Sequence, residues 1–292
     1  MAPPEQMNEG AELVCTLAST PLAEGFVFGD GVRWHENRVW FSDLHGNRIM
    51  TADVAGNLAV IAETDHPSGL GWLPDGTLVF GTFGAPYLKR LETTGDVSVI
   101  HDFGPDASSL NDLVVGPGGR IYLDLYDDGY GEARRGHVVL VTPGGAQQVT
   151  EDLMTPNGIG ITPDQTTLIV SETYACRLLA YPIMADGTLG DRRIFADLAT
   201  PLRPDGLCID EEGAVWVGTV DASEFLRVLD GGVVTHRIPT PGRWAVAPAL
   251  GGNDRRTLYL LTAETTYPDL ARGQSKGYIE QTRVEIPGAG WP

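Results

Sequence analysis

Cysteine, basic residues and long apolar runs are all scarce in this sequence of 292 residues. The three cysteines, Cys15, Cys176 and Cys208, lie far apart and form no CxxC pair, which excludes a disulfide-stapled scaffold and predicts structural thiols in a reducing cytoplasm. No stretch approaches the roughly 18 uncharged apolar residues of a membrane span. The first twelve residues lack the basic and apolar regions of a signal peptide. We therefore expect a cytoplasmic protein.

Positive charge is also scarce, because 20 Lys and Arg stand against 39 Asp and Glu and give a net charge of −19. An acidic surface repels nucleic acid and anionic membranes, so we expect neither as a partner. Apolar residues make up 42% of the chain, which is ordinary for a globular protein and excludes disorder. We expect a small-molecule substrate and a monomer or small homo-oligomer.

A motif that occurs six times carries most of the information in the chain. Most copies have a polar residue followed by glycine and apolar residues, then a turn containing Pro, Asp or Gly, then a β-rich run; the third copy has Asn-Asp in place of the polar-Gly pair. The copies read GDGVRWHENRVWF from Gly29, PSGLGWLPDGTLVF from Pro67, LNDLVVGPGGRIYL from Leu110, PNGIGITPDQTTLIV from Pro156, PDGLCIDEEGAVWV from Pro204 and a degraded WAVAPALGGNDRRTLYL from Trp244.

The spacing of the copies predicts a six-bladed β-propeller with very little helix. The anchor residues of the copies, of which Asp30, Ser68, Asn157 and Asp205 precede a glycine, stand at 30, 68, 111, 157 and 205, with Ala247 as a less regular sixth, so the steps run from 38 to 48 residues. A β-sandwich or two all-β domains is the alternative, but a sandwich does not repeat a polar-Gly anchor six times. We predict one domain over 1–292 with residues 1–10 flexible, closed by a strand at 12–18 that pairs with the last blade.

Equivalent positions on the innermost strands of a propeller form a ring around the central channel. Here that ring consists of Asp30, Ser68, Asn111, Asn157, Asp205 and Ala247. Two carboxylates held close together repel each other, and a divalent cation relieves that repulsion. Because the ligands are oxygens only, Ca²⁺ is our first expectation, with Mg²⁺, Mn²⁺ or Zn²⁺ as alternatives. The competing interpretation is that Asp and Asn before Gly are simply turn formers.

Other candidate motifs are weaker. The six histidines show no metal-ligand spacing, and neither a G-x-S-x-G elbow nor a phosphate-binding loop is present. Arg134 and Arg135 are interpreted as part of a solvated loop rather than a substrate clamp. Glu172 fits either a structural role or a place just behind the ring.

At its anchors the sequence resembles the family of senescence marker protein, gluconolactonase and luciferin-regenerating enzyme. The resemblance spans residues 22–287 and rests on GDGVRW, LNDLVVGPGGRIY, TPNGIGITPDQTTLIVSET, RPDGLCIDEEGAVWV and KGYIEQTRVEIPG. It implies a six-bladed propeller with one divalent metal at the channel mouth. Carried onto this chain, it implies that Asp30, Asn157 and Asp205 bind the metal and that Asn111 lies beside metal and substrate.

Two positions depart from the family pattern. Asp30 replaces the family's Glu and is one methylene shorter, so Glu24 is an alternative ligand. Ser109 replaces an Arg that sugar lactonases often carry, and a hydroxyl cannot make the bidentate contacts of a guanidinium. Together with Leu110, Ser109 favours a rather apolar substrate over an aldonolactone. Ser109, Asn111 and Asp112 are the predicted substrate-binding residues.

The sequence therefore predicts a metal-dependent hydrolase, most simply a lactonase or esterase-like enzyme. Asp205 and Asn111 are the predicted catalytic residues, with the cation as Lewis acid and Asp205 as the base that activates water. Rim loops at 84–88, 127–136, 219–224 and 265–277 are expected to set specificity. A metal-dependent aldolase, hydratase or cyclase is one alternative, and a non-catalytic binding propeller is another.

Overall fold

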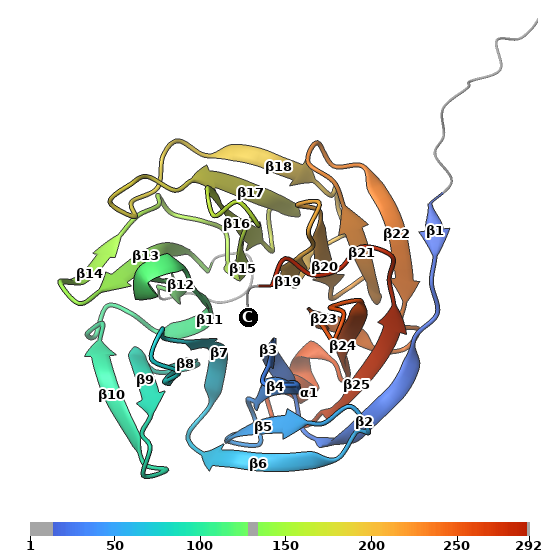
Figure 1. Ribbon diagram of the computed structural model, residues 1–292, viewed down its shortest axis with the longest axis horizontal. Coiled ribbons are helices and arrows are strands. Elements are labelled where there is room, and N and C mark those ends of the chain that lie inside the picture. Colours follow the sequence, from blue (N-terminus) through green and yellow to red (C-terminus); the bar gives the residue numbers. More distant parts are fainter. Residues whose placement is uncertain (1–13, 128–133, 291–292) are drawn as a thin grey trace, which may run out of the picture.

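Six small sheets stand around one axis, as Figure 1 shows in a computed structural model that describes residues 14–127 and 134–290. Each sheet is one blade, and the strands of a blade follow each other outward from the channel. Within the described residues helix is confined to the short α1 (Tyr267–Leu270) and the 3₁₀ turn Pro117–Gly119. The predicted six-bladed, nearly all-β propeller is confirmed.

Four blades are uninterrupted four-stranded meanders. Blade one contains β3 (Gly29–His35), β4 (Arg38–Asp43), β5 (Arg48–Ala52) and β6 (Leu58–Glu63). Blade two contains β7 (Pro67–Trp72), β8 (Leu78–Thr82), β9 (Tyr87–Leu91) and β10 (Val97–Asp102). Blade three contains β11 (Ser109–Val115), β12 (Ile121–Tyr126), β13 (Gly136–Thr142) and β14 (Gly145–Gln148). Blade four contains β15 (Pro156–Ile161), β16 (Thr167–Glu172), β17 (Arg177–Pro182) and β18 (Arg193–Asp197).

The two remaining blades receive strands from the start of the chain. Blade five contains β19 (Pro204–Ile209), β20 (Val215–Thr219), β21 (Glu224–Val228) and β22 (Val234–Pro239), and β1 (Cys15–Thr16) adds to it in parallel. Blade six contains β23 (Trp244–Gly251), β24 (Thr257–Glu264) and β25 (Lys276–Arg283), and β2 (Thr20–Phe26) completes it. The closing strand is therefore 20–26 and not the predicted 12–18, of which 12–13 lie outside the described residues.

Apolar side chains fill the space between neighbouring blades. Among the residues that the structure describes, six hydrophobic clusters form, one at each blade-to-blade interface. Val114 packs toward blade four, whereas the next residue, Val115, packs toward blade two. This division follows from the two-residue period of a strand, which sends successive side chains to opposite faces. Each blade therefore needs apolar residues on both faces, and its inner strands contain few polar positions.

The repeated glycine allows the inner strands to approach each other at the axis. A Cβ on Gly206 would lie 2.4 Å from the Cβ of Ala247, and one on Gly31, whose φ is +57°, would lie 2.7 Å from the carbonyl oxygen of Ser68. The close approach of neighbouring inner strands also corrects the position of the sixth anchor. A Cβ on Gly158 would meet Asp205 and Gly206 of the next blade, and a Cβ on Gly206 would likewise meet Val246 and Ala247. Val246 therefore occupies the anchor position of blade six, and Ala247 occupies the glycine position.

A buried ion pair stabilises blade five and supplies a stability prediction. Arg227 Nε donates to Asp210 Oδ2 at 2.7 Å, and their side chains are 5% and 0% exposed. Arg227→Leu leaves the Asp210 carboxylate buried without its cation, so we expect a loss of about 3–5 kcal/mol in the free energy of unfolding. Arg193→Ala breaks an exposed Arg–Asp pair and should cost less than about 1 kcal/mol. Urea unfolding measures both, and equal losses would contradict the assignment.

Candidate active site

Each inner strand is interrupted by a β-bulge at its anchor. Pairing shifts register at Asp30/Arg33, Pro67/Leu70, Leu110/Leu113, Pro156/Ile159, Pro204/Leu207 and Ala245/Ala247. A bulge re-aims the side chains of the strand that contains it. The six innermost strands surround the axis in Figure 1, so the bulges lie around one channel.

A chain of hydrogen bonds connects polar side chains from blades three, four and five. Asn111 Nδ2 donates to Asn157 Oδ1 at 3.1 Å. The side chain of Asn157 is in turn hydrogen-bonded to Asp205, and that of Asn111 to Asp124. The predicted residues Asn111, Asn157 and Asp205 are thus brought together at one end of the channel.

Two carboxyl groups in the ring, the buried Asp205 and the partly buried Asp30, have raised pKa values. Burial, reinforced by the charge of Asp112, raises the pKa of Asp30 to about 7. Burial, reinforced by the charge of Asp30, raises the pKa of Asp205 well above its ordinary value. Each carboxylate disfavours the ionised form of the other, and a bound cation would relieve this repulsion.

The donor set suits a hard divalent cation. Carboxylate and amide oxygens are the ligands that Ca²⁺ and Mg²⁺ prefer, and a cation bound there would lower the pKa values of Asp30 and Asp205, which burial raises. The turn-former interpretation also holds in part, since Asp30 Oδ1 and Asn157 Oδ1 each accept a hydrogen bond from the next N–H, at 2.7 and 2.8 Å. Oδ1 of Asp30 therefore supports the bulge, whereas Oδ2 takes no part in this hydrogen bond.

Two predicted substrate-binding residues are already engaged within the protein. Ser109 Oγ accepts a hydrogen bond from Gly84 N at 2.8 Å and is buried. Asp112 pairs with the buried Arg33 at 2.7 Å and also accepts from Leu113 N. The Arg33–Asp112 pair links blade one to blade three and thereby connects their inner strands, β3 and β11.

Asp124 is a buried group that sequence reasoning missed. It lies on β12, is fully buried, accepts from Asp112 N at 2.6 Å through Oδ1, and has no partner at Oδ2. Burial, and then the charge of Asp112, raises its pKa well above the ordinary value. Only its position inside the apolar run IYLDLY indicated a special role. Its contact with Asn111 fixes the orientation of that amide.

Aromatic rings and guanidinium groups stand around this end of the channel. Arg134 lies over the rings of Tyr126 and Phe83, with its Cζ 4.8 and 5.7 Å from the centroids, so it is packed against aromatic rings and not simply solvated. Burial raises the pKa of Tyr126, and the charges of Asp205 and Asp30 contribute, which places this phenol near the ring. The residues 128–133 of the same predicted rim loop lie outside the described residues.

Blade five supplies a second guanidinium at the same end. Arg203, two residues before Asp205, lies over the Tyr174 ring at 4.7 Å and pairs with Asp221 at 2.9 Å. Tyr267 of α1 donates to the same Asp221 carboxylate at 3.3 Å. The predicted rim segments 219–224 and 265–277 therefore meet above blade five.

Burial and position decide the interpretation of three other residues. Leu110, which favoured an apolar substrate, is completely buried in the core between blades two and three. Glu24 lies on β2, the outermost strand of blade six, and is exposed, so it does not face the channel. Glu172 has a structural role, because its carboxylate accepts hydrogen bonds from Met154 N at 2.8 Å and Arg177 Nε at 2.5 Å.

The other end of the channel is covered by the end of the described chain. Gly288–290 line a cavity of about 50 Å³ together with Arg33 and Cys208. Ala289 N donates to Ile209 O at 3.1 Å, and Gly288 N donates to Arg255 O at 2.8 Å. Burial raises the pKa of the Cys208 thiol and disfavours its thiolate. Substrate access is therefore expected from the end that carries Asp30 and Asp205.

Comparison with known proteins identifies a family. Residues 28–264 match the family described as SMP-30/Gluconolactonase/LRE-like region. A 6-deoxy-6-sulfogluconolactonase from Pseudomonas putida is 32% identical over 197 residues, which are 65% of this chain and 66% of that protein. The matched stretch thus spans just under two thirds of that relative, and half or less of several others.

Solved structures share the fold. A calcium-binding protein, regucalcin, from Agrobacterium tumefaciens superposes with a TM-score of 0.76 at 21% identity, over 95% of this chain and 99% of that one. A gluconolactonase from Xanthomonas campestris superposes with a TM-score of 0.72 at 24% identity, over 92% and 88%. In the parts of the chain that the structure describes, no helix has the length and apolarity needed to cross a membrane.

Proposed function

The chain belongs to the SMP-30/gluconolactonase/LRE-like family, and we propose that it is a lactone hydrolase that works with one divalent cation bound by Asp30, Asn157 and Asp205. The observation that carries this proposal is the convergence of two carboxyls of raised pKa, one buried and one partly buried, with two carboxamides at one channel end. Such a group of oxygens gains most from Ca²⁺, our first choice of metal, with Mg²⁺, Mn²⁺ or Zn²⁺ as alternatives.

When bound, the cation supplies Lewis acidity toward the lactone carbonyl. Asp205 accepts a proton from water as the water oxygen attacks the carbonyl carbon. The ring C–O bond then breaks, and the same proton passes to the leaving oxygen, which yields a hydroxy acid. Asn111 holds the substrate, and Asp124 keeps the Asn111 amide in place. Ser109 and Asp112 shape the wall behind Asn111.

A hydroxylated, polar lactone fits this channel end better than an apolar one. Leu110 is turned into the core, whereas Arg134, Arg203 and Tyr126 surround the entrance. Ser109 stands where sugar lactonases of the family often carry an arginine. Arg134 supplies a guanidinium from another segment of the chain. The Pseudomonas putida relative is named for a sulfonated gluconolactone, so sugar lactones with and without an anionic substituent are the substrates of choice.

Acid release from a lactone panel tests the proposed function. The panel contains gluconolactone, a sulfonated or carboxylated sugar lactone, an alkyl lactone and a phenyl ester, each assayed with calcium and with chelator. We expect turnover of a sugar lactone that disappears with chelator and returns with cation. Solvent ¹⁸O in the product distinguishes hydrolysis from aldolase, hydratase or cyclase chemistry. Metal-replete protein that hydrolyses none of the panel would count against the assignment.

Calcium affinity should depend on pH, because cation and protons compete for the same carboxylates. The pKa of Asp30 is about 7 in the absence of a cation, so the carboxyl is protonated below that pH. We expect affinity to rise by about tenfold per pH unit between pH 5.5 and 7 for each proton displaced, and to level off above pH 7 as far as Asp30 is concerned. Calorimetric titration at several pH values measures this. Equal affinity at pH 5.5 and 7.5 would contradict it, and Asp30→Asn should flatten the profile.

A further inference from the structure

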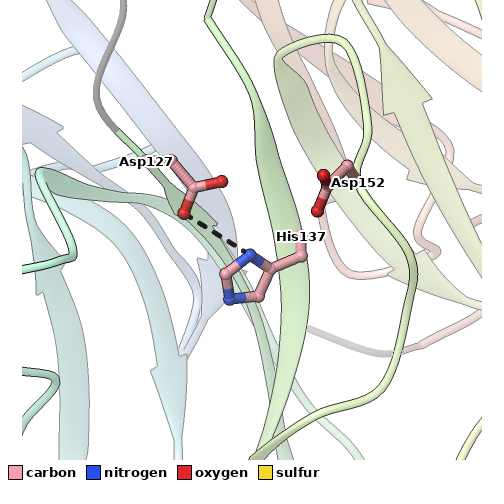
Figure 2. Close-up of side chains that lie close together, drawn as sticks. All are labelled: Asp127, His137 and Asp152. Carbon is pink, nitrogen blue, oxygen red and sulfur yellow. Dashed lines mark ion pairs between the residues drawn. The ribbon is translucent and has the colours of Figure 1, made fainter.

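A second group of metal-ligating side chains lies outside the channel, on blade three. Asp127, His137 and Asp152, here called the blade-three cluster, point toward one another in Figure 2. Each offers one ligand atom, and these atoms all lie within 4.8 Å of one another. His137 Nδ1 is 3.6 Å from Asp127 Oδ1. The spacing of histidines in the sequence gave no indication of this group.

Backbone hydrogen bonds hold the three residues in place. Leu125 pairs with His137 across β12 and β13, and Asp127 N donates to Arg135 O at 3.0 Å. Gly136 and Leu153 exchange two hydrogen bonds, of 3.1 and 2.7 Å, which set Asp152 beside His137. The cluster is therefore assembled by the fold of the blade and not by one flexible segment.

The cluster faces away from the channel. Asp127 and His137 line a cavity of about 320 Å³ between blades two and three, together with Leu125. Tyr126, between Leu125 and Asp127, lies instead near Asp205 and Asp30. The same cavity is lined by residues of β10, β13 and β14, which are outer strands of blades two and three, so the blade-three cluster and the channel ring belong to different sites.

We propose that the blade-three cluster binds a first-row divalent metal ion of the Zn²⁺ or Co²⁺ class. One imidazole nitrogen and two carboxylate oxygens form a mixed set that such ions prefer, whereas Ca²⁺ prefers oxygen alone. Ligands at about 2.0–2.2 Å around a tetrahedral ion stand about 3.4 Å apart. The His137–Asp127 distance already matches, and the exposed Asp152 reaches the same geometry by rotating its side chain.

The bound ion would join three segments of the blade. It would link the end of β12, the start of β13 and the connection between β14 and β15. Asp127 is hydrogen-bonded to Arg135, the neighbour of Arg134, so the ion would be held close to that guanidinium. The cavity beside the cluster leaves room for water as a further ligand. This inference does not rest on the proposed lactonase activity.

Cobalt titration of the full chain tests the proposal. We expect wild-type protein saturated with calcium to bind one Co²⁺ with the visible absorption of a nitrogen-containing site, and Zn²⁺ to displace it. His137→Asn and Asp152→Asn should each weaken Co²⁺ by about 100-fold or more, since loss of a ligand exceeds the 10–100-fold effect of outer groups. Asp106→Asn, in the same cavity, is the matched control and should change affinity by less than tenfold.

The outcomes separate this site from the channel. Asp205→Ala should remove the calcium site and leave Co²⁺ binding at the blade-three cluster intact. Unchanged Co²⁺ affinity in both His137→Asn and Asp152→Asn, with circular dichroism confirming the fold, would overturn the proposal. So would equal weakening by Asp106→Asn, which would indicate general attraction to negative charge and not ligation. Absence of lactonase activity with normal Co²⁺ binding would overturn the proposed function alone.

Discussion

Asp205→Asn is expected to lower kcat by about 10²–10⁴-fold while the protein keeps its cation. The substitution preserves the shape of the side chain and one ligating oxygen but removes the group that accepts the proton from water. Asp205 lies in the bulge of β19 at the channel end, 9% exposed, beside Asn157. Bound to a cation it would stay ionised, because the positive charge would offset the burial that raises its pKa.

Turnover and metal content must be measured on the same sample of Asp205→Asn. If Asp205 were only a turn former, Asn would replace it at little cost, since Asn is an equally good turn residue. Asp205→Ala should lose both cation and activity. Asp221→Asn makes the same chemical change on a nearby carboxylate that pairs with Arg203, and it should alter KM more than kcat. Near wild-type kcat in Asp205→Asn would end the assignment of the base.

The repeat made the fold and most of the ring predictable. A polar residue followed by glycine recurs because each inner strand needs a bulge and a close approach at the same height in the channel. In the sixth copy, where the motif is degraded, the predicted anchor is wrong by one residue, because Val246 and not Ala247 occupies the anchor position. The closing strand was placed too early because β2 is mostly exposed and shows no clean alternation of apolar and polar residues.

The groups that support the ring were not predictable from the sequence. Asp124 reaches Asn111 across one bulge, and no spacing in the sequence marks that contact. Leu110 was assigned to the substrate side, but its side chain points into the core between blades two and three. In the blade-three cluster, Asp152 reaches His137 only through the pairing of Gly136 with Leu153. In each case a tertiary contact decides the role of the residue.

Asp30→Ala is expected to weaken calcium binding by about 100-fold or more and to lower kcat/KM in parallel at limiting calcium. The variant removes one of the two carboxylates whose mutual repulsion the cation relieves. Titration by calorimetry, and activity measured against calcium concentration, should give the same shift. If calcium affinity fell while activity at limiting calcium did not, the cation would take no part in the reaction.

The variant Asp30→Glu separates ligation from support of the bulge. Asp30 Oδ1 accepts from Gly31 N at 2.7 Å, so Ala also removes a local hydrogen bond. Glu restores the carboxylate with one more methylene, and we expect it to bind calcium at least as well as the wild-type protein. Asp30→Asn keeps the hydrogen bond but not the charge, so its affinity should fall between those of Ala and Glu. Glu24→Ala, on the outer strand of blade six, should bind calcium like wild type. Unchanged affinity in Asp30→Ala would remove blade one from the metal site and leave its carboxyl as a part of the bulge only.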